Sequence, residues 1–442
     1  MNARFGWKGG VPGNVLITGA RVVDPRQKLD QQLDVLVTEG VITEVGPVGT
    51  ITTGDSTTTV NADNGILMPA FTDPHIHLRT PGQEHKETIA TGTKAAAAGG
   101  YCLVIAMPNT SPVIDGPDLL RGILARASET AVIPMAQTGA ITRGLAGTEL
   151  TEMATMMETG AAGFTDDGIA VRDAGVLRRA LRYQAVAGGV IALHEEDSAL
   201  SMGAPLNEGV ISARLGLRGQ PGSAESTMIA RDCALARMEE AVIHIQHVST
   251  YESVEVIRRE KALGTRVTAE ASPHHLLLTE EACSTLDSRA KMNPPLRTEM
   301  DRNAVIAGLI DGTLDCVATD HAPHSDDEKS QPFEDAPFGT TGLETSFAVL
   351  YDELVTPGLI SLPLLVERMT SGCIPFGFEP PTVAVGQPAN LALFDTRAEW
   401  IAGDGGWVSM SSNSCFAGRT MSGRISLTLA GGVIVHTAEA TQ

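Results

Sequence analysis

The chain has 442 residues, 43% of them hydrophobic, and its 32 Lys and Arg against 53 Asp and Glu give a formal net charge of −21. Because a single core stops growing near ~250–300 residues, this length predicts two domains. The acidic excess argues against non-specific binding to nucleic acid or anionic membranes. Six scattered cysteines form no CxxC pair, which indicates neither a disulfide framework nor a thiolate zinc site. With no apolar leader and no 18-residue apolar span, the sequence predicts a cytoplasmic protein.

Both ends of the chain are rich in short strand-like segments separated by Gly, Pro and Asp. These segments are 15–19, 21–24, 35–37 and 41–45 near the start, and 389–395, 424–430 and 432–436 near the end. No segment between 15 and 65 has the period of a helix. We therefore expect residues 1–65 and 385–442 to pair into one small β-sandwich domain.

The middle of the chain, residues 66–384, alternates short apolar strands with helical segments. The strand candidates are 66–71, 101–107, 131–136, 161–165, 190–193, 242–246, 266–270 and 315–319. Helical segments between them include 87–98, 117–128, 173–187, 224–237 and 251–262. Eight such units predict an α/β fold, a closed (β/α)8 TIM barrel whose chemistry lies at the carboxyl ends of the strands.

Histidines and one aspartate stand at the ends of several of these strands. His75 and His77 are two residues apart, so in an extended segment both side chains project to one face and can bind one ion. His194, His247 and Asp320 end three later strands. A single such histidine is more often a satisfied core or rim residue. Four imidazoles and a carboxylate that share this location instead predict a centre for one or two zinc ions.

Two metal ions close together need a shared anionic ligand to offset their repulsion. Residues 95–260 contain no lysine, so a carbamylated lysine is not available and a carboxylate must serve. Asp166 and Asp167 follow the fourth strand and offer two, although Asp-Asp-Gly is also typical of a plain turn. His244 lies three positions before His247, so strand alternation predicts that it faces the helices and is structural.

Seven short motifs follow one another along nearly the whole chain. They are PHIHLR (74–79), MPNT (107–110), FTDDG (164–168), HEED (194–197), QHVS (246–249), MNPPLR (292–297) and ATDHAPH (318–324). In this order they resemble the amidohydrolase superfamily, and specifically its type I bacterial dihydroorotases. Glu195, where that family often has Cys or a small residue, and Thr80, where Glu is usual, depart from the pattern, but neither is a proposed ligand.

The resemblance implies a set of metal ligands and a set of substrate contacts. The implied metal ligands are His75, His77 and Asp320 for one ion and His194 and His247 for the second, with Asp167 as the bridge and Asp166 as its alternative. The implied substrate contacts are His77, Arg79, Asn109, Asn293, His324 and the backbone of Phe338 and Gly339. Without the resemblance, Arg79 could be a solvated rim cation, and the two asparagines and His324 could be loop caps.

The reaction implied is the interconversion of N-carbamoyl-L-aspartate and L-dihydroorotate in pyrimidine biosynthesis. One or two Zn²⁺ would activate water, and Asp320 would act as general acid and base. Arg79 would bind the substrate carboxylate through its planar fork. Residues 325–338, which are polar and acidic, are expected to form a mobile lid that is disordered without ligand.

Two other functions are compatible with parts of this pattern. A dihydropyrimidinase or allantoinase type of cyclic amidase would share the barrel, the HxH pair and the final aspartate, but such enzymes generally use a carbamylated lysine. A non-catalytic partner of aspartate transcarbamoylase would usually have lost metal ligands. The resemblance also allows a homodimer and a complex with that transcarbamoylase, and the sequence decides neither, nor how many metal sites are occupied.

Overall fold

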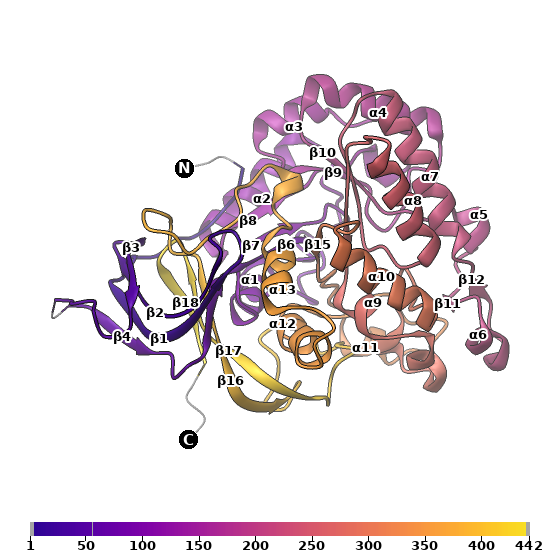
Figure 1. Ribbon diagram of the computed structural model, residues 1–442. Coiled ribbons are helices and arrows are strands. Elements are labelled where there is room, and N and C mark those ends of the chain that lie inside the picture. Colours follow the sequence, from indigo (N-terminus) through magenta and orange to yellow (C-terminus); the bar gives the residue numbers. More distant parts are fainter. Residues whose placement is uncertain (1–3, 55, 439–442) are drawn as a thin grey trace.

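The computed structural model describes residues 4–54 and 56–438. In Figure 1 the strands from both chain ends, drawn in indigo and yellow, lie together at the left, and the helices of the middle of the chain extend to the right. The two regions are in contact through α1, α12 and α13, which pack against strands of the chain ends.

Strands from both chain ends form one eight-stranded sheet. Its strands are β1 (Val15–Asp24), β2 (Leu29–Thr38), β3 (Val41–Pro47), β4 (Thr58–Asn61), β5 (Ile66–Pro69), β16 (Leu391–Ile401), β17 (Thr420–Ala430) and β18 (Val433–Thr437). The order is β18-β17-β16-β5-β1-β2-β3, with β4 beside β1. Alternate residues in parts of β1 and β2, such as Val15 and Ile17 or Val35 and Val37, join Leu391 in one buried apolar cluster. This alternation is what a sheet with one buried face requires.

Apart from the short pair of β11 (Leu206–Asn207) and β12 (Gly219–Gln220), the middle of the chain contributes eight parallel strands in two groups. The first group is β6 (Phe71–Ile76), β7 (Tyr101–Ala106) and β8 (Met135–Gln137), and the second is β9 (Gly163–Thr165), β10 (Val190–Leu193), β13 (Ile243–Ile245), β14 (Val267–Ala271) and β15 (Cys316–Val317). A parallel bridge between Gly139 and Phe164 joins β9 to the end of β8, and one between Ile76 and His321 joins β6 to the segment after β15. The two groups therefore meet at both of their ends.

Helices connect these strands. The longer ones are α1 (Ile89–Ala98), α2 (Pro117–Thr130), α3 (Met153–Thr159), α4 (Ala174–Ala187), α7 (Ser223–Met238), α8 (Tyr251–Ala262), α10 (Glu299–Asp311) and α13 (Leu362–Thr370). The short elements are α5 (Ser198–Ser201), α6 (Val210–Leu215), α9 (Pro273–Leu277), α11 (Asp326–Lys329) and α12 (Ser346–Leu350), with a small sheet of β11 (Leu206–Asn207) and β12 (Gly219–Gln220). None of the helices in 4–54 and 56–438 is long and apolar enough to cross a lipid bilayer.

Local sequence explains where these helices begin and which face they bury. In α4 the Asp173 side chain accepts a hydrogen bond from Val176 N, which satisfies one of the free N–H groups of the first turn. Leu177, Ala180 and Leu181 are buried at the spacing of one helix face. The predicted helix at 251–262 has the bounds of α8, and the other four begin and end within two residues of observed helices.

One predicted strand of the barrel is wrong. The apolar run at 66–71 was expected to be the first parallel strand, but β5 pairs with β1 and β16 in the sheet of the chain ends. The first parallel strand is β6, which contains Asp73, Pro74 and His75. The two strands are both fully buried and only Ala70 separates them, but β5 has the apolar sequence ILMP whereas β6 (FTDPHI) contains Thr72, Asp73 and His75, so a search for apolar runs selects β5.

Candidate metal centre

Six predicted ligands converge at the carboxyl ends of the parallel strands. His75 lies at the end of β6 and His77 just beyond it, while Asp167 follows β9 and His194 follows β10. His247 and Asp320 lie two and three residues beyond β13 and β15. All six side chains are buried. The carboxyl ends of parallel strands meet at one edge, which is why residues from 75 to 320 share a site.

The first group of donors has the spacing of a metal site. His75 Nε2 lies 3.4 Å and His77 Nε2 lies 3.1 Å from Asp320 Oδ1. Asp167 completes the group, with Oδ1 3.3 Å from His75 Nε2 and Oδ2 3.5 Å from His77 Nε2. In a tetrahedral zinc site with bonds of about 2.0–2.1 Å, neighbouring donor atoms lie about 3.3 Å apart. These four side chains are therefore spaced as ligands of one cation.

A second pair of imidazoles lies beside this group. His194 Nδ1 and His247 Nε2 are 2.9 Å apart, and both lie within 3.8 Å of Asp167 Oδ1. Asp167 thus faces all four histidines. Asp166 instead accepts hydrogen bonds from Ile141 N and Thr142 N, at 2.8 and 3.0 Å, so its carboxylate is committed to the backbone. Of the two aspartates, only Asp167 is positioned to bridge.

Two sets of donors close enough to hold an ion are found in the described part of the chain. One is His75, His77 and Asp320, and the other is His75, Asp167 and His247. The first set matches the group that the resemblance assigns to one metal. The second set contains His75 in place of His194, which the resemblance implies for the second ion. His75 belongs to both sets because its Nε2 lies close to the carboxylates of both Asp167 and Asp320.

Three of the four imidazoles have an oxygen acceptor on the nitrogen that faces away from the centre. The pairs are His75 Nδ1 with Glu270 Oε1 at 2.7 Å, His77 Nδ1 with Asn109 Oδ1 at 2.9 Å, and His194 Nε2 with Glu196 Oε2 at 3.3 Å. Such an acceptor keeps the proton on the outer nitrogen and leaves the lone pair of the inner nitrogen for a metal ion. Glu196 and Glu270 were not among the predicted residues. The sequence could have indicated Glu270, because it places a carboxylate inside the strand VTAEA. A charged side chain is rarely buried in a strand unless it has a partner.

The predicted orientation of His244 is wrong. Its Nε2 lies 2.9 Å from Glu270 Oε2, and Glu270 in turn contacts His75, so His244 points toward the centre of the parallel strands. Strand alternation cannot be counted back from His247, because β13 ends at Ile245 and His247 has a positive φ of 32°. The strand period therefore does not extend to His247. The interpretation of His244 as a structural residue remains a prediction.

The charges of the centre favour a bound cation. Burial opposes ionisation of His75, but the carboxylates of Asp167, Asp320 and Glu270 outweigh it and raise the pKa of His75 well above its ordinary value. Burial likewise opposes ionisation of Asp320, yet the neighbouring His75 and His77 hold the pKa of that carboxyl below its usual range. His75 Nε2, the nitrogen that faces Asp167 and Asp320, is buried without a hydrogen-bond partner in the described residues. An unpartnered imidazole nitrogen among ionised carboxylates fits a divalent metal ion.

A cavity of about 320 Å³ opens above these ligands. It is lined by His77, Arg79, Asn109, Asp167, Gly168, His194, His247, Asn293, Asp320, Ala322, His324, Pro337, Phe338 and Gly339. This set includes every predicted substrate contact and five of the six predicted metal ligands. His75 lies beneath the cavity and does not line it. Gly168, Ala322 and Pro337 were not predicted.

Arg79 brings a positive charge into this cavity. The residue is 9% exposed, with Nε 3.0 Å from Pro323 O and Nη2 3.3 Å from His324 Nε2. Burial lowers the pKa of Arg79 to about 10, so the guanidinium is charged at neutral pH. No carboxylate among residues 4–54 and 56–438 forms an ion pair with it. Burial and the adjacent Arg79 lower the pKa of His324 to about 3, so that imidazole is neutral.

The segment 325–338, predicted to be a disordered lid, is tethered to the rest of the chain. It begins with α11, and Lys86 Nζ lies 2.8 Å from Glu328 Oε1. Lys329 is buried, and its Nζ donates to Pro337 O and Gly339 O, both at 2.9 Å. These contacts give no support to the expectation of a loosely held lid.

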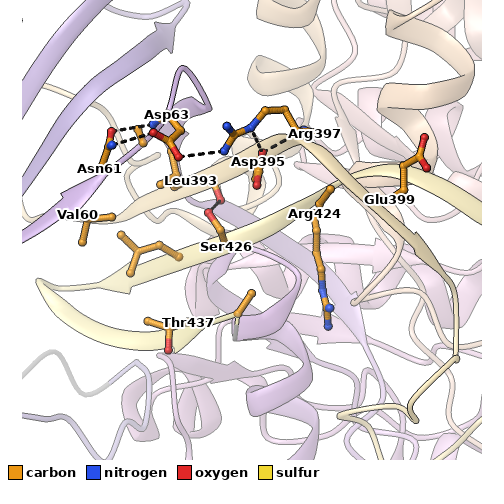
Figure 2. A pocket seen from close by; sticks show the side chains of 14 residues that line it. Val60, Asn61, Asp63, Leu393, Asp395, Arg397, Glu399, Arg424, Ser426 and Thr437 are labelled. Carbon is orange, nitrogen blue, oxygen red and sulfur yellow. Dashed lines mark hydrogen bonds and ion pairs between the residues drawn. The ribbon is translucent and has the colours of Figure 1, made fainter. Parts of the chain in front are cut away.

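A larger cavity, of about 820 Å³, lies at the sheet of the chain ends (Figure 2). Arg397 reaches across it to Asp63 and Asp395, with an N–O distance of 3.2 Å to each. None of the predicted metal or substrate residues lines this cavity. Its volume is therefore unrelated to the chemistry of the strand ends.

An α/β arrangement with parallel strands that carry histidine and aspartate donors at their carboxyl ends is typical of metal-dependent amidohydrolases. A family model described as dihydro-orotase-like matches residues 64–253. A dihydroorotase of Geobacter metallireducens is 42% identical, covering 96% of this chain and 99% of its own, and one of Acetivibrio thermocellus is 40% identical, covering 95% and 98%. The chain belongs to the dihydroorotase family.

Solved structures share its fold. The L-hydantoinase of Arthrobacter aurescens matches with a TM-score of 0.85 at 23% identity, covering 96% of both chains. The dihydropyrimidinase of Brevibacillus agri matches with a TM-score of 0.80 at 22% identity, covering 95% of this chain and 94% of its own. At these identities the similarity establishes the fold alone.

Proposed function

We propose that this chain is a zinc-dependent dihydroorotase of the type I group, which interconverts N-carbamoyl-L-aspartate and L-dihydroorotate. The observation that carries the proposal is the charged Arg79, which faces the same small cavity as the histidine and aspartate donors. Both compounds carry a carboxylate, for which a planar guanidinium is the natural partner. The relatives named dihydroorotase match nearly the whole chain, which supports the same reaction.

Zinc suits the donor set of imidazole nitrogens and carboxylate oxygens. His75, His77 and Asp320 would hold one ion and His194 and His247 a second, with Asp167 between them. When bound, the metal supplies a Lewis acid that polarises the substrate carbonyl and lowers the pKa of water from ~15.7 toward ~7. Everything else in the reaction falls to residues of the chain.

The cavity walls orient the substrate. Arg79 would bind the carboxylate, while Asn109 and Asn293 offer amide groups that also line the cavity. Asn109 also contacts His77 Nδ1 and Asp167 Oδ2, at 2.9 and 3.2 Å, so its position is already set by the centre. The backbone of 338–339 would contact the pyrimidine ring. Fixing the ring in this way brings its amide carbon within reach of the attacking water.

Asp320 is placed to move the proton. Its Oδ1 lies near His75 and His77, and no hydrogen bond to its Oδ2 is found in the described part of the chain. The low pKa of Asp320 keeps it ionised and able to accept a proton. In ring opening it would take a proton from the attacking water and deliver it to the departing ring nitrogen. In ring closure the same carboxylate would run the transfer in reverse.

The parallel strands would form a closed (β/α)8 barrel, supported by the bridges Gly139–Phe164 and Ile76–His321. Residues 66–384 would make up this domain, and 1–65 with 385–442 a β-sandwich domain folded around the apolar cluster of the chain ends. The pairing of β5 with β1 and β16 favours a boundary near residue 70. A cytoplasmic location, a homodimer and a complex with aspartate transcarbamoylase stay predictions.

Turnover of three cyclic amides by the purified protein tests the proposal. Dihydroorotate, dihydrouracil and hydantoin would be compared by loss of ultraviolet absorbance, with metal per chain measured on the same sample. We expect turnover of dihydroorotate alone, and its loss in His75→Ala. Preferred turnover of the two neutral substrates would identify a hydantoinase type of enzyme, the function that the shared fold also allows. A protein with no bound metal and no turnover would favour the non-catalytic role.

A further inference from the structure

A segment of the C-terminal region reaches the wall of the substrate cavity. We call residues 408–415, which lie between β16 and β17, the crossing segment. Ser411 Oγ donates to Lys86 O at 2.8 Å, and Cys415 N donates to Thr340 Oγ1, also at 2.8 Å. Thr340 Oγ1 in turn donates to Asn413 O at 3.1 Å. The crossing segment is therefore hydrogen-bonded to two chain segments that are far from it in sequence, one at Lys86 and one at Thr340.

Asn413 makes the central contacts of the crossing segment. It is buried, and its Nδ2 donates to Ala322 O at 3.0 Å and to Gly339 O at 3.1 Å. Its Oδ1 accepts a hydrogen bond from His324 N at 3.0 Å. One amide group thus binds two carbonyls and one N–H. Only one orientation of the amide satisfies all three, because a carbonyl accepts and an N–H donates.

The three backbone groups belong to two neighbouring segments, 322–324 and 338–340, which are themselves paired through a parallel bridge between His321 and Thr340 and a hydrogen bond from Ala322 N to Thr340 O at 2.9 Å. Ala322, His324 and Gly339 all line the cavity. The same backbone holds the side chains that face the substrate, since Arg79 Nε donates to Pro323 O at 3.0 Å and His324 Nε2 lies 2.8 Å from Phe338 O. The relative position of these two segments therefore determines where Arg79 and His324 lie.

We propose that Asn413 is a positioning residue for substrate binding: it clamps residues 322–324 to residue 339 and so sets the geometry of the carboxylate site around Arg79. Asn413 does not line the cavity and does not touch the reacting atoms. This inference rests on the proposed function and names a part of the chain, far away in sequence, that shapes that same site. It assigns a role in substrate binding to the C-terminal region.

The test compares Asn413→Asp and Asn413→Ala with Ser412→Ala. The aspartate has the same shape and keeps the acceptor for His324 N, but it offers no donor to the carbonyls of Ala322 and Gly339. Ser412 belongs to the crossing segment, but its hydroxyl donates to the exposed Asp326, at 2.6 Å, and, within the described part of the chain, to no backbone group of the cavity lining, which makes it the matched control. We expect KM for L-dihydroorotate to rise about 10- to 100-fold in both Asn413 variants, because displacing a binding group by about 1 Å has effects of this size. Metal per chain and the Ser412→Ala kinetics should be unchanged.

A purely structural role makes a different prediction. It would lower the melting temperature while the folded variants kept the KM of the unmutated protein, and KM within twofold of that value in both Asn413 variants overturns the proposal. A second measurement needs no variant. The His324 amide should exchange with solvent as slowly as amides of the neighbouring strands, because Asn413 Oδ1 accepts it, and rapid exchange would also overturn the clamp.

The hydrogen-exchange measurement separates this inference from the proposed function. If the unmutated protein does not turn over dihydroorotate, the proposed function fails. The clamp is then decided by whether exchange at residues 322–324 and 339–341 accelerates in Asn413→Asp but not in Ser412→Ala. Acceleration supports the clamp, and equal exchange in all three proteins refutes it.

Discussion

Glu270 Oε1 lies 2.7 Å from His75 Nδ1, and the two side chains, 195 residues apart in sequence, are both fully buried. The other oxygen of Glu270 lies 2.9 Å from His244 Nε2. A carboxylate in this position keeps the proton of His75 on Nδ1 and turns Nε2 toward Asp167 and Asp320.

Replacing Glu270 with Gln should therefore weaken metal binding. An amide in place of the carboxylate removes the charge that orients His75, and outer contacts of this kind are worth about 10- to 100-fold in metal affinity. Zinc affinity would be measured by competition with a chromophoric chelator, which does not depend on turnover. Asp34→Asn, which also alters a buried carboxylate but in the sheet of the chain ends, is the control. Equal affinity in the two variants would refute the role of Glu270.

Replacing Arg79 with Lys should raise KM for dihydroorotate by about 10- to 100-fold, because a charge-assisted hydrogen bond is worth about 1.5–3 kcal/mol and Lys lacks the planar fork. Metal content should not change, since Arg79 is not a metal ligand in either donor set. Steady-state kinetics with dihydroorotate check this. Arg121→Lys, an exposed change in α2, serves as control, and an unaltered KM in Arg79→Lys would count against a carboxylate site at Arg79.

Replacing Asp320 with Asn should lower kcat by about 10²–10⁴-fold, the usual contribution of a positioned acid or base. The amide retains an oxygen near His75 and His77 but cannot accept the proton. Single-turnover kinetics on protein of known metal content would measure the effect. Asp335→Asn, an exposed change near the same cavity, should leave kcat unaltered. A fully metallated Asp320→Asn enzyme with the original kcat would remove Asp320 from the mechanism.

The buried amine of Lys329 should make the free energy of unfolding depend on pH. Burial lowers its pKa from 10.5 in the unfolded chain to about 7 in the folded protein. Between these values the unfolded chain binds the extra proton, so this group makes folding more favourable as the pH rises from 7 toward 10. Relative to Lys329→Met, the free energy of unfolding of the unmutated protein should increase by about 1 kcal/mol per pH unit between pH 8 and 9. Urea unfolding at both pH values measures it, and a pH-independent difference between the two proteins contradicts the buried, neutral amine.

Much of the fold could be predicted because its signals are local. The helix at 251–262 has the predicted bounds because Thr250 caps it and Val254 and Ile257 repeat at the period of a helix face. The first parallel strand could not be located from hydrophobicity, because β6 contains Asp73 and His75 while the more apolar β5 beside it pairs with strands of the chain ends. The orientation of His244 was predicted wrongly for a related reason, since the backbone leaves the strand conformation before His247.

By itself the sequence determined which ligand types this protein carries and that they stand at strand ends, because the periodicity of a strand and the polar residue that follows it are adjacent in the chain. It also placed Arg79 two residues beyond His77. Only the tertiary structure decided that Asp167 rather than Asp166 faces the histidines, that Glu270 orients His75, and that Asn413 reaches the cavity wall. Each of these depends on the distance between residues far apart in the chain, and that distance is set by how the strands and loops pack together.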